Sequence, residues 1–280
     1  MGTATKVTDS RDSDAVPGWD GHLLLLHSSE DERRAALAAW VRRGLERGEK
    51  VIYTEGPAAA RDSLSSVLQA HGLDAEAAQR EGRLAVLPLA EFYPPHGQDA
   101  VVGRALAEGF PAVRLSAQAG AALSLLSPRA YLRAERDIER LCRTRTVSSL
   151  CQYRRATTIG TWLAKAVGVH LPGIRHARLA TSGAGRGLRV CGELDVCNVE
   201  VFGAVLTAAI RRTARTVWLD LAAVDVVDAA ACRMLVEASD RFRTGGGRVL
   251  LVGPQAHVDQ VMRRLDLDLV PGMHLVGGDP

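Results

Sequence analysis

Short apolar runs alternate with amphipathic stretches along most of this chain. The run HLLLLH at 22–27 is typical of a fully buried strand, and the residues after it have apolar positions at helical spacing. Ser29 and Glu32 form a capping box at the start of this helix, which Gly48 ends. The apolar positions of the helix are Ala36, Leu37, Trp40, Val41 and Leu45. The pattern therefore predicts a strand followed by a helix.

The same alternation continues to residue 167. Further strands are predicted at 51–54, 84–89, 111–116 and 147–153. Helices are predicted from Pro57 to Gly72, around 101–109, from Pro128 to Arg143 and around 157–167, with a short helix before residue 84. Such alternation predicts a mostly parallel sheet with helices on both faces and a ligand crevice at the carboxyl ends of its strands.

The pattern changes between residues 168 and 187. The segment IRHARLA can form a short strand, and TSGAGRG is interpreted as a flexible linker. Strands are then predicted at 188–194, 216–222, 248–253 and 269–276, and helices at 198–212, 229–243 and 254–265. We therefore expect an α/β protein with a flexible tail at 1–19, a first domain at 20–173, a linker with a candidate first strand at 174–187, and a second domain at 188–280.

The composition is that of a globular protein with two domains. The chain has 280 residues, of which 47% are hydrophobic and 24% charged. Its net charge of +3 comes from interspersed basic and acidic residues, and only 4% of the residues are aromatic, so we expect no nucleic-acid surface. The apolar run at 23–26 is far too short to span a membrane, and we expect none to be crossed.

Metal and enzyme motifs are absent from the sequence. The 5 cysteines lack the paired spacing of a zinc site, and without a signal peptide we expect reduced thiols in a cytoplasm. His22 and His27 point to opposite faces of one strand, no second cysteine or carboxylate completes a tetrahedral set, and no metal is expected. Glu135 and Asp137 are interpreted as a solvated helix face.

Nor does the chain contain the loops of common enzymes. It has no GxxxxGK[ST] phosphate loop, no GxSxG elbow and no HExxH metal helix. TSGAGRG lacks the lysine that a phosphate loop needs. We therefore expect a protein without cofactors that is not an enzyme.

Three motifs in the second domain occur in a characteristic order. They are GELD at 192–195, VDVVD ending at Asp228, and the glycine turn at 245–247 followed by a strand and Pro254. Together they resemble the STAS domain, the sulfate transporter and anti-sigma factor antagonist fold. From the residues alone, Asp195 ends a strand, Asn198 is an N-cap, and Asp228 lies at a strand–helix junction, so a turn and cap role stays open.

The resemblance implies a serine after Asp228 that a partner kinase, itself an anti-sigma factor, phosphorylates. Here Ala229 stands at that position, and no serine or threonine occurs between Thr216 and Ser239. Ala229 keeps the uncharged state, which predicts either a permanently competent antagonist or a module with some other contact. The predicted partner-binding residues are Asp195, Asn198, Asp228, Ala229, Ala230, Ala231 and Cys232.

Two cysteines near this position suggest a redox switch in place of phosphorylation. Cys232 lies in the first turn of a helix, where the dipole lowers a thiol pKa, and Cys197 follows Asp195 in a loop that the resembled fold brings near. The alternative is that Cys232 is a small apolar core residue.

The first domain resembles the MEDS domain, a sensory module related to RecA-like ATPases, which implies a RecA-like sheet. The segments that carry the resemblance are GLERGEKVIY, GRLAVLP, Cys151-Gln152-Tyr153, His170 and Pro172. Leu24 and His27 stand where the family has a cysteine and a tyrosine, Arg114 to Gln118 lacks the family's acid, and Arg154 replaces another acid. The candidates for ligand sensing are His22, His27, Arg114, Cys151 and Tyr153.

The two resemblances imply a bacterial, cytoplasmic, non-enzymatic regulator of transcription by signal transduction. Its STAS domain is expected to bind an anti-sigma factor of the serine kinase type or another STAS protein, under control of the sensory domain. A homodimer stays open. The alternative is a receptor whose N-terminal crevice binds a small molecule or nucleotide, with the STAS domain serving assembly.

Overall fold

A computed structural model of the protein places most of the chain. The described residues are 20–55, 63–93, 97–176, 178–184, 187–213 and 215–277. The predicted tail at 1–19 and the predicted helix start at Pro57 lie outside the described residues. Among the described residues, no helix has both the length and the apolar character needed to cross a membrane.

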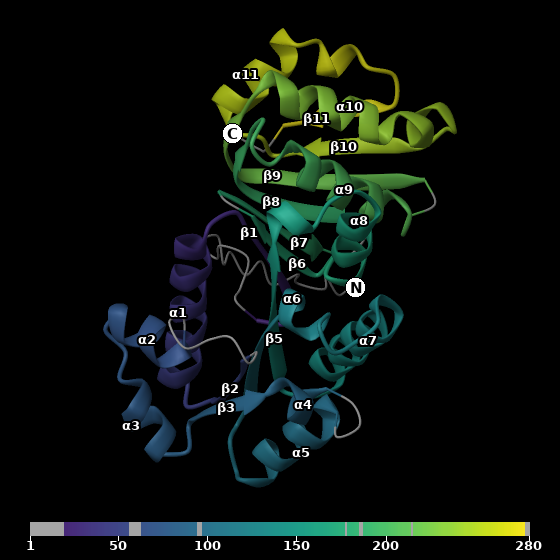
Figure 1. The fold of residues 1–280 in the computed structure, drawn as a ribbon. Coiled ribbons are helices and arrows are strands. Elements are labelled where there is room, and N and C mark those ends of the chain that lie inside the picture. The colour runs from purple at the N-terminus through teal and green to yellow at the C-terminus, as the bar shows by residue number, and fades with distance from the viewer. Residues whose placement is uncertain are drawn as a thin grey trace, which may run out of the picture.

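The strands of both predicted domains form one 11-stranded sheet (Figure 1). Its order is β11-β10-β9-β8-β7-β6-β1-β5-β4-β2-β3. Every described pair is parallel except β6–β7 and β7–β8. The strands are β1 (His22–His27), β2 (Lys50–Glu55), β3 (Leu84–Pro88), β4 (Val113–Gln118), β5 (Val147–Arg154), β6 (Gly173–His176), β7 (Leu179–Ala184), β8 (Gly187–Leu194), β9 (Thr216–Val227), β10 (Arg248–Val252) and β11 (Met273–Val276).

Helices cover both faces of the N-terminal half of this sheet, with α1 to α3 on one side and α4 to α8 on the other (Figure 1). They follow the strands as the α/β pattern predicts, which confirms the fold class. The helices are α1 (Glu30–Glu46), α2 (Leu64–Ala70), α3 (Ala75–Arg80), α4 (Leu89–Phe92), α5 (Gln98–Ala107), α6 (Ala119–Ala122), α7 (Pro128–Thr144), α8 (Gly160–Val169), α9 (Val199–Ile210), α10 (Ala229–Thr244) and α11 (Ala256–Arg264).

The segment interpreted as a linker forms central strands of the sheet. β6 pairs in parallel with β1 and antiparallel with β7, and β7 pairs antiparallel with β8. The interpretation of TSGAGRG as a flexible linker is wrong, because 181–184 belong to β7 and Gly187 begins β8. A Cβ on Gly187 would lie 2.2 Å from the Trp218 carbonyl oxygen, so this glycine permits close packing of backbones.

Helix packing also joins the two halves. α8 packs against α9, and an ion pair connects Arg155, just after β5, with Glu200 in the first turn of α9. Arg212 Nη2 donates to the carbonyl oxygen of Gly168 at 3.3 Å. One apolar core runs through both halves, from Leu24 in β1 to Met273 in β11. The halves are therefore joined by a sheet, a helix contact and a common core.

Candidate functional site

A buried polar cluster lies inside the N-terminal half. His22 is the first residue of β1, Cys151 lies within β5, Glu135 lies on α7, and His170 is the C-cap of α8. All four side chains are buried among apolar neighbours. His22 lies at the amino end of its strand, whereas the predicted ligand crevice is at the carboxyl ends.

The cluster is centred on one carboxylate oxygen, Glu135 Oε2. This oxygen lies 3.2 Å from His22 Nε2 and 3.1 Å from His170 Nε2, and it accepts a hydrogen bond from Cys151 Sγ at 3.3 Å. Cys151 Sγ is also 3.4 Å from His22 Nε2. One donor atom of each of the four side chains lies within 4.8 Å of the other three.

A second layer of hydrogen bonds orients these groups. His22 Nδ1 lies 3.1 Å from Glu139 Oε2, and His170 Nδ1 lies 2.9 Å from the carbonyl oxygen of Ala166. The hydroxyl of Tyr153 donates to Glu135 Oε1 at 3.2 Å. Both imidazoles therefore direct Nε2 at the same point, and the carboxylate is held from behind.

Charge and burial act against each other in this cluster. Burial alone raises the pKa of Glu135, yet the neighbouring His170 and His22 hold that pKa well below its ordinary value. Burial lowers the pKa of His22, but hydrogen bonds to Glu135 and Glu139 outweigh it and raise that pKa. Burial and the charge of Glu135 raise the pKa of Cys151 well above its usual range. The cluster therefore holds a fully buried negative charge beside a protonated thiol.

The C-terminal half presents a different arrangement, at the loop between β8 and α9. Asp228 is the N-cap of α10, and its Oδ1 accepts from the backbone N–H of Ala231 at 2.8 Å. Its Oδ2 accepts from the N–H of Val196 at 2.9 Å. Asp195 Oδ1 accepts from the N–H of Cys197 at 2.9 Å. One carboxylate thus connects the loop to the start of α10.

Comparison with known families identifies both halves. The family model described as "MEthanogen/methylotroph, DcmR Sensory domain" (MEDS) matches residues 21–171, more than half of the chain. The chain belongs to the MEDS family. The STAS domain model matches residues 181–275, so the chain is a MEDS domain joined to a STAS domain. Both match the resemblances found in the sequence.

Solved structures are similar to single parts of the chain. The anti-sigma factor antagonist SpoIIAA, in its unphosphorylated form, is 22% identical over 35% of this chain and 87% of its own, with a TM-score of 0.30. A KaiC-like protein of Pyrococcus horikoshii is 13% identical over 61% of this chain and 78% of its own, with a TM-score of 0.42. No curated protein matches the chain.

Some of the predicted sensing residues of the MEDS domain meet in the buried cluster and others do not. His22, Cys151 and Tyr153 meet there. His27 is on the opposite face of β1, where its Nδ1 lies 3.2 Å from the carbonyl oxygen of Ser29. Arg114 also lies elsewhere.

The guanidinium of Arg114 is held by two carboxylates. Its Nε donates to Glu49 Oε2 at 2.5 Å, and its Nη2 donates to Asp20 Oδ1 at 2.7 Å. The group lies 4.3 Å from the ring centre of Trp40. These contacts hold the Arg114 side chain between α1 and the sheet, which is a structural role.

Sequence reasoning missed Glu135, the centre of the cluster. Its interpretation as part of a solvated face is wrong, because Glu135 is 3% exposed, while Asp137 is exposed. The expectation that no carboxylate completes a set around His22 is therefore also wrong. The signal was available: Glu135 falls on the apolar stripe of α7, between Tyr131 and Ile138.

The predicted partner-binding residues of the STAS domain divide by exposure. Ala229 is exposed, Asp195, Asp228 and Ala230 are half-buried, and Asn198, Ala231 and Cys232 are buried. Sequence reasoning missed Val196, which is 68% exposed at the tip of the loop. Val196 and Ala229 are therefore the exposed side chains at this loop, and the buried residues lie beneath them.

Asn198 stands at the N-cap position of α9, as predicted, but its side chain makes no capping hydrogen bond with the described backbone. Its Oδ1 accepts from the N–H of Asp195 at 3.2 Å, and its Nδ2 donates to the carbonyl oxygen of Glu193 at 2.8 Å. Asn198 therefore shapes the loop from inside.

Cys232 contradicts the expectation of an activated thiol. It is 2% exposed, and burial together with the charge of Asp228 raises its pKa to about 11. Both causes act in the direction opposite to the predicted effect of the helix dipole. Cys197 is exposed in the loop. Cys232 thus fits the alternative role of a small apolar core residue.

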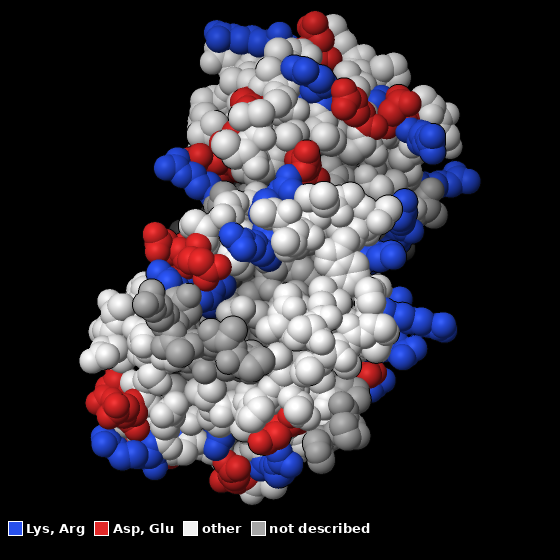
Figure 2. Space-filling model, viewed as in Figure 1, with Lys and Arg blue, Asp and Glu red and all other residues white. Residues whose placement is uncertain are grey.

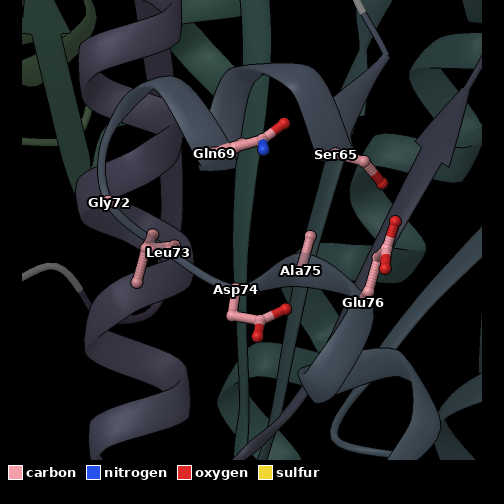
Figure 3. A pocket seen from close by; sticks show the side chains of 7 residues that line it. All are labelled: Ser65, Gln69, Gly72, Leu73, Asp74, Ala75 and Glu76. Carbon is pink, nitrogen blue, oxygen red and sulfur yellow. The ribbon is translucent and has the colours of Figure 1, made fainter.

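Two surface hollows lie apart from these residues. One, of about 820 Å³, lies between α8, α9 and α10, with Ile159 and Leu163 of the MEDS domain facing Gly203 and Met234 of the STAS domain. The other, of about 470 Å³, is lined by α2, α3 and the turn between them (Figure 3). Its side chains Ser65, Gln69, Asp74 and Glu76 are polar.

Basic and acidic side chains are interspersed over the face of the molecule that Figure 2 shows.

Proposed function

We propose that this protein is a non-enzymatic signalling regulator. Its STAS domain binds a regulatory protein through the loop at 195–197 and the first turn of α10. Its MEDS domain responds to a chemical signal and alters that binding. The family match supports a regulator of this kind.

The observation that carries the proposal is the position of Ala229. Ala229 is exposed as the first residue of α10, directly after the capping carboxylate of Asp228. STAS proteins of the anti-sigma antagonist type present a serine there to a kinase partner. A methyl group at this position leaves the surface uncharged, and we infer that the chain stays competent to bind the partner.

The junction between the domains supports control by the MEDS domain. The Arg155–Glu200 ion pair and the packing of α8 on α9 connect the end of β5 to the helix that follows the loop at 195–197. His170, a member of the buried cluster, caps α8. A change at the cluster that moves α8 would therefore reach α9 and the binding loop.

The kind of partner follows from the STAS domain. We propose a serine-kinase-type anti-sigma factor, or another STAS protein that is assembled with one. Binding to this surface needs no cofactor. The exposed apolar side chain of Val196 and the small side chain of Ala229 allow a partner to approach the helix terminus closely.

The proposal is tested by binding of the full-length chain to a purified anti-sigma factor of this type from the same organism. Ala229→Asp places a charge on the contact, and we expect binding to weaken at least about tenfold, which corresponds to about 1.4 kcal/mol. Ala256→Asp is the matched control, because Ala256 is an exposed first residue of α11 in the same domain. Equal binding by both variants would contradict the proposed face.

A second variant tests the inferred loss of the switch. Ala229→Ser restores a hydroxyl beside Asp228, and we expect the partner to transfer phosphate from ATP to this variant and not to the native chain. Phosphorylation of the native chain to the same extent would contradict the role assigned to Ala229.

A further inference from the structure

We propose that His22, Glu135, Cys151 and His170 bind one Zn²⁺ ion inside the MEDS domain. The site goes beyond the proposed function, because binding of a protein at the STAS loop does not require it. It reverses the sequence-based expectation of a chain without metal.

Four of the six distances between the donor atoms fit a tetrahedral site, and all six lie within 4.8 Å. Zinc bonds of 2.0–2.3 Å to nitrogen, oxygen and sulfur place neighbouring ligand atoms about 3.3–3.6 Å apart. Glu135 Oε2 lies 3.2 Å from His22 Nε2, 3.3 Å from Cys151 Sγ and 3.1 Å from His170 Nε2. His22 Nε2 lies 3.4 Å from Cys151 Sγ. Small side-chain shifts suffice to admit the ion.

His170 supplies an independent indication of a bound cation. Its Nδ1 faces the carbonyl oxygen of Ala166 at 2.9 Å, so the ring hydrogen is on Nδ1 and Nε2 carries a lone pair. This buried Nε2 has no hydrogen-bond partner among the described residues. It lies 3.1 Å from Glu135 Oε2. A cation placed between the two atoms would accept an electron pair from each.

The outer partners are those of a metal site. Metal-bound histidines usually donate their second ring N–H to a carboxylate or a backbone carbonyl. His22 meets Glu139 in this way, and His170 meets Ala166. Tyr153 donates to the second oxygen of Glu135 and fixes the carboxylate as a single-atom ligand. The ligands are thus oriented before an ion arrives.

The donor set selects the kind of ion. Two imidazoles, a thiolate and one carboxylate oxygen suit zinc, whereas magnesium and calcium prefer oxygen alone. On binding, the S–H bond of Cys151 and the Nε2–H bond of His22 break, both protons leave to solvent, and bonds from sulfur and from Nε2 to zinc form. The thiolate and Glu135 then balance the two charges of the ion. Four protein ligands close the coordination shell, as in structural zinc sites.

Solvent reaches the edge of the cluster at Glu139, whose side chain is 24% exposed and contacts His22. This edge is the route by which an ion would enter. Since His170 ends α8, and α8 packs on α9, occupancy would also act on the domain junction. That last step rests on the proposed function, while metal binding does not.

The test uses the full-length protein, stripped with a chelator and loaded with Co²⁺ as a spectroscopic substitute for Zn²⁺. We expect one ion per chain, a thiolate-to-cobalt charge-transfer band in the near ultraviolet and the intense visible bands of tetrahedral cobalt. Cys151→Ser removes the charge-transfer band, and Glu139→Gln weakens binding about 10- to 100-fold. Cys197→Ser and Cys232→Ser are matched thiol controls and keep the band. His27→Gln, on the same strand as His22, keeps it too.

Each result of the cobalt test either supports the zinc site or overturns it. Absence of the charge-transfer band from the loaded native chain would overturn the proposal, and so would loss of the band in Cys197→Ser instead of Cys151→Ser. If Cys151→Ser does not fold, the native spectrum and a Zn²⁺-dependent rise in the melting temperature of the stripped chain still decide it. Failure of the Ala229 binding test leaves these results unaffected, so the two proposals fail separately.

Discussion

The MEDS and STAS domains hold their candidate functional groups in opposite ways. In the MEDS domain, Glu135 lies in the protein interior and is surrounded by side chains from distant parts of the sequence. In the STAS domain, Asp228 lies at the surface and is satisfied by backbone N–H groups of the loop and helix next to it. The first arrangement depends on the assembled core, and the second depends mainly on local backbone geometry.

This difference predicts a large effect for the buried carboxylate. We expect Glu135→Ala to lower the free energy of unfolding by about 3–5 kcal/mol, because it leaves His22 and Tyr153 buried without their common partner. Urea unfolding followed by circular dichroism measures the change. Asp137→Ala on the same helix is the control, since Asp137 is exposed and forms an ion pair with the exposed Arg140. A loss no larger than that of the control would remove the distinction between interior and surface sites.

A smaller effect is expected at Gly187, where the segment interpreted as a linker pairs with the STAS strand β9. Gly187→Ala places a methyl group 2.2 Å from the Trp218 carbonyl oxygen, so β8 must move away from β9. We expect a destabilisation of about 1–3 kcal/mol by thermal or urea unfolding. Gly120→Ala is the control, because nothing lies within 4 Å of its added Cβ. Similar stability of the two variants would show that the strands do not pack closely here.

The surface carboxylate of the STAS domain comes next. Asp228→Ala removes the cap of α10 and the partner of the Val196 N–H, and we expect a loss of about 0.5–2 kcal/mol in unfolding free energy. Asp225→Ala changes an exposed aspartate of β9 and should leave stability nearly unchanged. Partner binding should fall with Asp228→Ala and not with Asp225→Ala. A destabilisation as large as that of Glu135→Ala would erase the contrast between the domains.

The same contrast explains what could be predicted from the sequence. Asp228 was placed correctly at a strand–helix junction, because a cap is specified by residues within one turn. The cluster combines β1, α7, β5 and the end of α8, and no local pattern reports that these segments meet. Glu135 was the one local clue, a charged residue on an apolar stripe.

The junction was misinterpreted for a related reason. Gly183 and Gly187 suggest flexibility when only their sequence is considered, since glycine is common in linkers. In the structure they belong to paired strands, with Gly183 near Leu171 of the MEDS domain and Gly187 near Trp218 of the STAS domain. Close approach of backbones and a flexible linker both favour glycine, and only the tertiary packing distinguishes them.

The smallest effect is expected at Asp20, a half-exposed carboxylate of the MEDS domain. Its oxygens lie 2.7 Å from Arg114 Nη2 and 2.9 Å from Arg43 Nη2. Partial burial raises its pKa, but Arg43 and Arg114 outweigh burial and lower the pKa from 3.8 to about 2. Because the folded-state pKa is the lower one, the stabilisation is fully present above pH 3.8 and is lost as the pH falls through 2.

Asp20→Asn should therefore be less stable than the native chain at neutral pH by less than about 1 kcal/mol, since solvent screens a half-exposed pair. The difference should shrink as the pH falls toward 2, where the native carboxyl also becomes neutral. Urea unfolding of both proteins across this range measures it. If the difference in unfolding free energy does not change with pH, Asp20 acts through hydrogen bonds that do not depend on the charge of its side chain. The pairing of Asp20 with the arginines would then depend on hydrogen-bond geometry, as the contacts of Asp228 with backbone N–H groups do in the STAS domain.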